Sequence, residues 1–213
     1  ARAREALAIV EDEETMRAST QYPMILVAAG RLLVAEGRPE EALAGLLSAG
    51  EMLTAAGMDC PSAVPWQADA ALAAGLAGER DKAGDLAAGA LAAARRGGAP
   101  TAICRALRAG ARTERGEVAI GRHREALAVL EGLPPRLERA HAPVDLGAAL
   151  RRNRRRAEAR DLLRRGLAEA VGGGATALAE RARVEPAAAG ARRTEPRDGL
   201  AALTPSERRV AEM

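Results

Sequence analysis

The residues best suited to contact a charged partner are eight arginines in the C-terminal half of the chain. They are Arg151, Arg152, Arg154, Arg155, Arg156, Arg160, Arg164 and Arg165. The first five are candidates for contact with DNA, because arginine neutralises phosphate charge. A solvated hairpin tip with internal ion pairs, such as Asp161 with Arg165 four residues later, explains the same cluster. We favour this second interpretation because no aromatic side chains accompany the arginines to stack on bases.

Residues that could support catalysis lack the neighbours that catalysis needs. The only lysine, Lys82, stands between Asp81 and Ala83, whereas a phosphate-binding P-loop carries its lysine directly before Ser or Thr. The acid pairs Glu13-Glu14 and Glu40-Glu41 have neither a histidine nor a metal partner in the pattern, which favours solvated helix faces. We therefore expect this chain not to be an enzyme and not to bind ATP through a P-loop.

The cysteines and histidines do not predict a metal site. Cys60 and Cys104 lie 44 residues apart, with only His123 and His141 besides, and these positions do not match the spacing of zinc sites. We expect reduced thiols in the cytoplasm, histidines at the surface or between helices, and no cofactor or metal. No uncharged apolar run reaches the roughly 20 residues that a membrane-spanning helix needs, so we expect no membrane partner.

The composition predicts an all-α protein. Phe is absent, Trp and Tyr occur once each, and Ala, Leu and Arg, all strong helix formers, are abundant. Such small side chains leave little volume per residue for a core, so the helices must approach closely in two thin layers. Residues 1–100 carry 9 basic and 14 acidic residues, and residues 101–213 carry 23 basic and 15 acidic ones. Any attraction to nucleic acid is therefore expected in the second half.

Proline and glycine divide the chain into pairs of helices. Proline suits the first helical turn and glycine the residue after the last one, and apolar residues recur at helical spacing between them. We predict helices at 1–14, 23–36, 39–56, 65–77, 81–96, 100–115, 135–150, 156–171 and 175–189. The triplet Gly172–Gly174 is predicted to end one of them. The sequence therefore predicts about 9 to 11 helices arranged as hairpins.

Alanine recurs at one place in each pair. Ala42 follows Gly37 by five residues, Ala83 follows Gly78, and Ala159 follows Arg154, which stands where the other turns have glycine. Ala126 fits the third pair, whose turn is either Gly121 or, as we favour, Gly116-Glu117. A methyl group at this position lets the two helices cross closely. Intervals of 33 to 43 residues between these alanines are typical of a tetratricopeptide-like helical solenoid, although an alanine-rich chain also produces such spacings by coincidence.

Two prolines disturb the helical pattern. Pro143 lies inside the helix predicted at 135–150 and is expected to kink it, and Pro186 is expected to shorten or bend the last helix. Residues 190–202 lose their periodicity and contain glycine and proline, which is typical of a linker. We therefore place a repeat domain at 1–189 and a linker at 190–202.

Residues 203–213 carry the signals of a new helix. Thr204 can cap it, Pro205 suits its first turn, and Glu207 can complete a capping box. This sequence, Leu-Thr-Pro-Ser-Glu-Arg-Arg-Val-Ala-Glu-Met, resembles the opening of a LuxR-type helix-turn-helix domain. The segments 136–140, 145–152, 156–163 and 174–182 resemble the region before that domain in large ATP-binding LuxR-family regulators of actinobacteria.

The resemblance is good over residues 100–213 and looser before them. The chain departs from the family pattern at His141-Ala142-Pro143, at Arg154 in place of glycine, and at Glu185-Pro186. The resemblance implies a fragment of a bacterial transcription regulator, containing its tetratricopeptide-like repeats and the first helix of its DNA reader. DNA would then be bound through a C-terminal domain beyond residue 213, and ATP through an N-terminal domain of the parent protein.

The repeats would present a concave surface to a protein or small-molecule effector, or to the ATPase domain of the parent protein. First helices of hairpins usually line such a surface, which nominates Arg31 and Trp66 as contacts. Trp66 as an ordinary core residue is the favoured alternative, and a homo-oligomer is compatible with this interpretation. Two other classes stay open: a free-standing adaptor without a DNA role, and an all-helical enzyme, which would need a convergent polar pocket.

Overall fold

The computed structural model describes residues 19–134 and 137–188, and α-helix is the only regular secondary structure within them. Nine helices are found in these residues: α3 (Tyr22–Ala35), α4 (Pro39–Ala55), α5 (Trp66–Leu76), α6 (Arg80–Gly97), α7 (Pro100–Thr113), α8 (Gly116–Ala128), α9 (Leu137–Arg152), α10 (Arg156–Gly172) and α11 (Thr176–Ala188). The predicted all-α class is confirmed. The predicted helix at 1–14, the linker at 190–202 and the helix start at Thr204, Pro205 and Glu207 lie outside the described residues.

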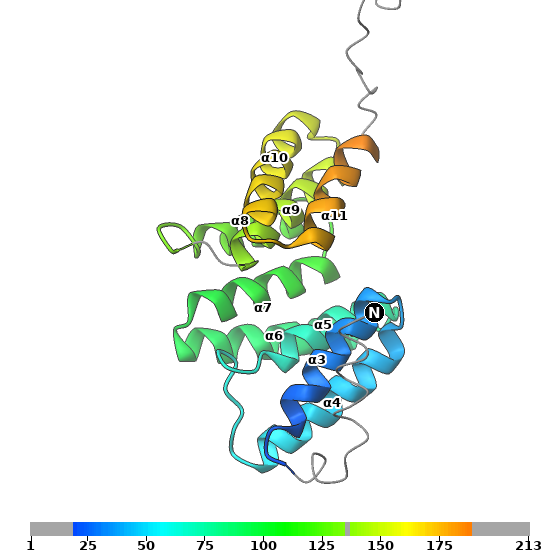
Figure 1. Ribbon diagram of the computed structural model, residues 1–213, viewed down its shortest axis with the longest axis vertical. Helices are drawn as coiled ribbons and strands as arrows, with labels where there is room; N and C mark the ends of the chain where they lie inside the picture. Colours follow the sequence, from blue (N-terminus) through cyan, green and yellow to red (C-terminus); the bar gives the residue numbers. More distant parts are fainter. Residues whose placement is uncertain (1–18, 135–136, 189–213) are drawn as a thin grey trace, which may run out of the picture.

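The helices form a stack of hairpins along the long axis of the molecule (Figure 1). The pairs α3–α4, α5–α6, α7–α8 and α9–α10 follow in chain order, and α11 packs on α10. First helices also contact one another, α3 with α5, α5 with α7 and α7 with α9, and α11 continues this series by contacting α9. Second helices contact the helices directly before and after them in the chain. The predicted helical-hairpin arrangement is therefore confirmed.

The alanine expected at each hairpin crossing is buried. Ala42, Ala83 and Ala126 are fully buried, and Ala159 is 3% exposed. The third turn is the one that we favoured, because Gly116 has a positive φ and begins α8, whereas Gly121 lies inside that helix. Ala126 therefore follows its turn at a longer distance than the other three alanines, although it occupies an equally buried position.

A second position pairs a small residue with a larger one across the hairpin. Gly30 lies seven residues before Gly37, and a Cβ there would lie 2.7 Å from Cγ of Leu46 in α4. Gly147 has the same relation to Arg154, and its Cβ would lie 2.7 Å from Cγ of Leu163 in α10. The two glycines leave the space that the two leucines fill. The equivalent positions of the second hairpin are both alanine, Ala71 and Ala87, and belong to one buried cluster.

The core is a chain of small clusters. One cluster joins α3, α4, α5 and the start of α6, and another joins α8, α9, α10 and α11. Between them, the cluster that joins α5, α6 and α7 consists of eight buried alanines, with Leu86, Leu91, Ala99 and Ile103 packed against it. Each cluster is shared only by neighbouring helices, as in solenoids that are stabilised by contacts between adjacent repeats.

Three of the four turns inside the hairpins share one geometry, and the turn between α7 and α8, where Glu114 is extended, differs. The N–H of Arg38 donates to the carbonyl of Leu33, and the N–H of Glu79 donates to the carbonyl of Ala74. The residue before each donor, Gly37 or Gly78, has a positive φ, which makes these turns Schellman motifs. In the fourth hairpin the N–H of Arg155 donates to the carbonyl of Leu150, and Arg154 has a φ of 64°. Arg154 is the only described non-glycine residue with a positive φ.

Neither internal proline ends its helix. α9 continues from Leu137 to Arg152 through Pro143, and α11 continues to Ala188, beyond Pro186. The kink expected at Pro143 therefore does not end α9, and its size stays a prediction. Proline costs about 3 kcal/mol in an ideal helix interior, but every residue from Ala142 to Leu150 is buried. The packing of this central helix offsets the missing N–H donor. No helix in residues 19–134 and 137–188 has the length and apolar character required to cross a bilayer.

We predict that Gly147→Ala lowers the free energy of unfolding by about 1–3 kcal/mol, because overfilling a packed core forces its neighbours to shift. The same substitution in a Leu163→Ala background should cost less, since alanine on both sides reproduces the second hairpin. Chemical denaturation of the four proteins of this cycle measures the difference.

The control is Gly121→Ala. Gly121 is exposed inside α8, and nothing lies within 4 Å of a Cβ there, so this variant should gain about 0.5–1 kcal/mol. Equal effects of Gly147→Ala in both backgrounds would contradict the proposed packing of Gly147 against Leu163.

Candidate functional site

The first helices of the four hairpins enclose a cavity of about 320 Å³. α3, α5, α7 and α9 all contribute to its lining, which makes it the groove on the inner face of the stack. Its charged residues are Arg31, Asp69, Arg105, Arg108, Arg112 and Glu138. Its apolar residues include Val34, Leu46, Leu72, Ala109 and Leu137. The volume falls in the range of small-molecule sites, which are mostly apolar with a few well-placed polar groups.

The cavity continues at both ends. A space of about 230 Å³ shares Arg31, Arg105 and Glu138 with it, and a space of about 560 Å³ shares Leu72 and Arg112. The larger of these spaces is also lined by Arg152 at the end of α9. Together the three spaces form one groove across the first helices, and Arg112 lies where two of them meet.

A ladder of charges crosses the groove from one first helix to the next. Nε of Arg31 in α3 donates to Oδ2 of Asp69 in α5 at 2.7 Å. Nη1 of Arg105 in α7 lies 3.8 Å from the same oxygen, while its Nη2 donates to Oε1 of Glu138 in α9. We call Arg31, Asp69, Arg105 and Glu138 the charge ladder. It joins each first helix to its neighbour by an ion pair.

One buried carboxylate binds three arginines behind the groove. Asp145 in α9 is 2% exposed. Its Oδ2 accepts from Nε of Arg108 at 2.7 Å, and its Oδ1 accepts from Nη2 of Arg112 at 3.0 Å and from Nη2 of Arg181 at 2.6 Å. These four residues are the Asp145 cluster. Arg108 and Arg112 come from α7 and Arg181 from α11, so one side chain connects three helices.

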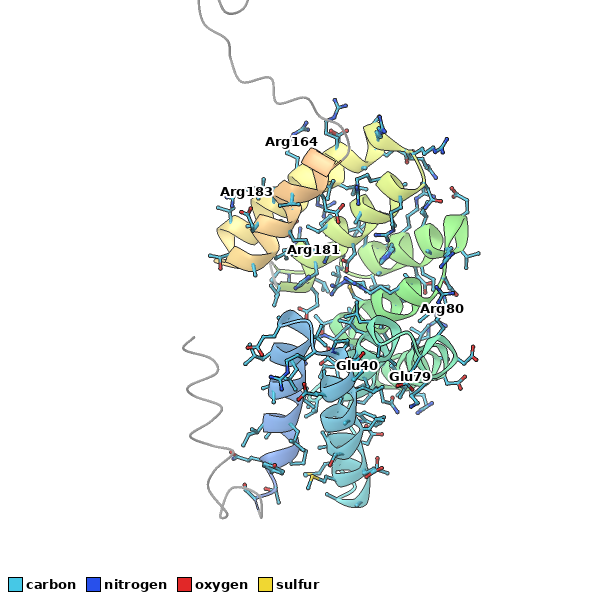
Figure 2. The ribbon with its side chains drawn as sticks, turned by 90° about the vertical axis from the view of Figure 1, so that its right-hand side faces the viewer. Glu40, Glu79, Arg80, Arg164, Arg181 and Arg183 are labelled. Atoms are coloured by element: carbon cyan, nitrogen blue, oxygen red, sulfur yellow. The ribbon has the colours of Figure 1, made fainter. Side chains whose placement is uncertain are left out.

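Arg181 and Arg183, both in α11, face opposite ways (Figure 2). Figure 2 shows Arg181 on the side of α11 that faces the other helices and Arg183 on its outer side. Arg183 is 55% exposed and pairs with Glu180 of its own helix. Of these two arginines, Arg181 is the one that ties α11 to α9, and a second tie joins Glu185 of α11 to Arg151 of α9.

The arginines keep Asp145 ionised. Burial alone would raise the pKa of this carboxyl, but Arg108, Arg112 and Arg181 hold it well below its usual value. The pKa of Arg112 is lowered: although Asp145 raises it, burial and the nearby charges of Arg181, Arg108 and Arg152 outweigh that effect. One carboxylate therefore does not balance the positive charge around it.

Both histidines lie beside this cluster in the neutral form. Burial is the main cause that lowers the pKa of His123 to about 4, and the charges of Arg112 and Arg108 add to it. His141, which lines the groove, has its pKa lowered to about 4 by burial and by Arg108. Nδ1 of each ring is buried and has no hydrogen-bond partner among the described residues. His123 is therefore an interhelix residue, which is one of the two positions expected for the histidines, at the surface or between helices.

Of the two residues nominated for the concave surface, only Arg31 lines the groove. Trp66 is 9% exposed and packs against Gly50 of α4, while its Nε1 donates to Oδ1 of Asp59 at 3.1 Å. Trp66 is therefore not a contact residue of this groove, in contrast to its nomination. The favoured alternative, that Trp66 is a core residue, agrees with the structure. The large ring fills the space that Gly50 leaves between α4 and α5.

The arginine cluster at the fourth hairpin is partly paired within the chain. Arg155 binds Glu158 and reaches Glu117 of α8, and Arg151 binds Glu185 of α11. The expected pair of Asp161 with Arg165 is wrong. Asp161 binds Arg164 one turn away, and Arg165 binds Glu169, which is less exposed. Arg152, Arg154 and Arg156 are exposed, and contact of the five candidates with DNA stays a prediction.

Apart from Arg31, the residues of the charge ladder and the Asp145 cluster were not predicted as site residues from the sequence. A signal for them exists: Arg105, Arg108 and Arg112 recur at helical spacing on one face of α7, and Asp145 interrupts an apolar run. Their bonds join residues 33 to 37 positions apart, which is close to one repeat. Arginines on one first helix and carboxylates one repeat later therefore identify the inner face.

No family model matches the chain, and no match is found among curated proteins. In residues 19–134 and 137–188, no three His, Cys, Asp or Glu side chains lie close enough together to hold a metal ion.

We predict that Asp145→Asn lowers the free energy of unfolding by about 3–5 kcal/mol, because three arginines lose a buried counter-charge. Asp161→Asn is the matched control, since the side chain of Asp161 is 77% exposed and exposed ion pairs contribute little. Urea denaturation at pH 7 compares the two. Similar losses in both variants would show that the Asp145 cluster does not stabilise the stack.

We also predict that the protein loses stability as the pH falls from about 6.5 to about 4. The folded pKa of His123 and of His141 is about 4, below the unfolded value of about 6.5. The unfolded state therefore binds protons first, and stability that is fully present above pH 6.5 decreases toward pH 4. Asp145 contributes little in this window, because its stabilisation is lost mainly as the pH falls from its unfolded pKa of about 3.9 toward its lower folded pKa.

The measurement is the free energy of unfolding at several pH values for the wild type and for His123→Leu. Between pH 7 and 4.5 the variant should lose about 2–3 kcal/mol less than the wild type, from the size of the pKa shift. The same pH dependence in both proteins would contradict a neutral, buried His123.

Proposed function

We propose that this chain is the regulatory helical-repeat region of a bacterial DNA-binding transcription regulator. Its groove binds an effector, and the bound state is relayed to a C-terminal helix-turn-helix domain. The resemblance of residues 203–213 to the start of a LuxR-type domain supports the DNA-binding part, and those residues lie outside the described ones. DNA is then the partner of the C-terminal domain, and ATP that of an N-terminal domain. The protein acts in the cytoplasm, where such regulators meet DNA.

The observation that carries the relay is the position of the Asp145 cluster. Arg108 and Arg112 line the groove, and Arg181 belongs to α11, the last described helix before residues 190–213. Asp145 lies between them and binds all three. A ligand that changes how Arg108 and Arg112 share this carboxylate also changes how firmly α11 is held. Two packings of α11 with different ligand affinities are sufficient for a shift in population.

The alternative is a free-standing adaptor that binds other proteins and has no DNA role. The groove itself favours it, because the described residues that line the cavity lie between Gly30 and His141 and so belong to the repeats. An enzyme is less well supported, since the charged groups of the groove are ion pairs of arginine with carboxylate and both histidines are neutral and buried.

The test uses the full gene product that contains this chain. We expect it to bind DNA from its own upstream region in a mobility-shift assay, with an affinity that decreases with added salt. A version that ends at residue 189 should fold, as judged by helical circular dichroism, and should not bind that DNA. If the full product binds no DNA, or if the shortened version binds equally well, the regulator proposal fails and the adaptor remains.

A further inference from the structure

The groove and the Asp145 cluster behind it contain more positive than negative charge. These charged side chains are partly buried, and an unbalanced charge is costly to bury. Five arginines, namely Arg31, Arg105, Arg108, Arg112 and Arg181, bind only three carboxylates, Asp69, Glu138 and Asp145. The charge ladder is balanced, so the excess lies in the Asp145 cluster. The side chain of Arg108 is 13% exposed and that of Arg112 is 32% exposed. Partly buried cations without enough counter-charge favour the binding of an anion.

Arg112 has hydrogen-bond donors left for that anion. It gives Nη2 to Asp145, and its Nε and Nη1 have no acceptor among the described residues. A guanidinium presents donors in a planar fork that matches a carboxylate or a phosphate. Arg112 also lies where the 320 Å³ and 560 Å³ spaces meet, and Arg152 lines the larger one. The larger space is also lined by Arg115 and by Glu114, and Glu114 is paired with Arg122.

The histidines do not reduce the excess charge, and they do not add to it. His141 lines the groove and His123 lies behind it, and both are neutral at pH 7.

Beside the cations the groove is apolar. Val34 of α3 and Leu72 of α5, both partly exposed, line it on one side, and Leu137 of α9, which is 51% exposed, lines it on the other. A simple inorganic anion would leave these side chains in contact with water. A ligand with a hydrocarbon part next to its anionic group would cover them, and apolar burial contributes about 25 cal/mol per Å².

We propose that the groove binds a small amphiphilic acid, that is, a molecule with a carboxylate or phosphate group next to an apolar body. Arg112 and Arg108 bind the anionic group, and Val34, Leu72 and Leu137 contact the apolar body. The cavity volume favours a small molecule over a peptide. This inference deepens the proposed function by naming the class of effector, and it rests on that proposal only for the consequence of binding.

The probes are hexanoate, hexyl phosphate, hexanol and inorganic phosphate, titrated by calorimetry into the chain of residues 1–213. We expect one or both of the hexyl acids to bind at least tenfold more tightly than hexanol and than inorganic phosphate, because only they have both parts. Comparison of the two acids identifies the preferred anion. Added salt should weaken their binding.

Arg112→Gln should weaken binding of the better acid by tenfold or more, because a charge-assisted hydrogen bond is lost. Arg112→Lys should retain part of the affinity. Arg164→Gln is the matched control, since Arg164 is an exposed arginine of α10 whose side chain is 69% exposed and pairs with Asp161. Figure 2 labels Arg164 at the surface. This variant should bind like the wild type.

A second measurement does not depend on the stability of a variant. In wild-type protein the Nε–H resonance of Arg112 should shift as hexyl phosphate or hexanoate is added, while that of Arg164 should not. Several results would overturn the proposal: no binding of either acid, equal binding of hexanol, unchanged affinity in Arg112→Gln with no shift at Arg112, or binding only of an acidic peptide. None of them affects the DNA-binding test, so the two proposals can fail separately.

Discussion

The small size of the core side chains is the constraint from which the architecture follows. Alanine and glycine at the crossings allow backbones to approach, and the approach is closest where Gly30 meets Leu46 and Gly147 meets Leu163. Such a core supplies little apolar area per residue, and the cluster that joins α5, α6 and α7 consists of alanine. Hairpins of this kind are not expected to be stable alone. Contacts between neighbouring hairpins therefore carry much of the stability.

Ion pairs between first helices supplement this thin core. The charge ladder connects α3, α5, α7 and α9, and the Asp145 cluster connects α7, α9 and α11. A buried carboxylate is costly to desolvate and is tolerated only when several donors bind it. The same arrangement leaves a cationic excess against an apolar surface. The arginines of α7 thus have two roles. They connect the helices through ion pairs, and they supply the positive charge that could bind an anion.

Local signals in the sequence predicted the helices well, because proline, glycine and alanine act through the backbone of their own hairpin. The turn at Arg154 was found by alignment with Gly37 and Gly78, and it has the same left-handed backbone in the structure. The groove was harder to predict, since its bonds join residues a whole repeat apart and depend on how hairpins stack. The continuation of α9 through Pro143 was hard to predict for a similar reason. The cost of proline to the helix is local, whereas the packing that offsets it comes from surrounding helices.

The fluorescence of Trp66 reports the unfolding of only one part of this chain. It is the only tryptophan, and it lies against Gly50 at the junction of α4 and α5. Its cluster shares no buried residue with the one that joins α8 to α11. Indole emission therefore reports the opening of the N-terminal hairpins and would stay native-like if α9, α10 and α11 separated first. A melting curve followed by fluorescence and one followed by helical dichroism need not coincide, and the gap between them would measure how loosely the two ends of the stack cooperate.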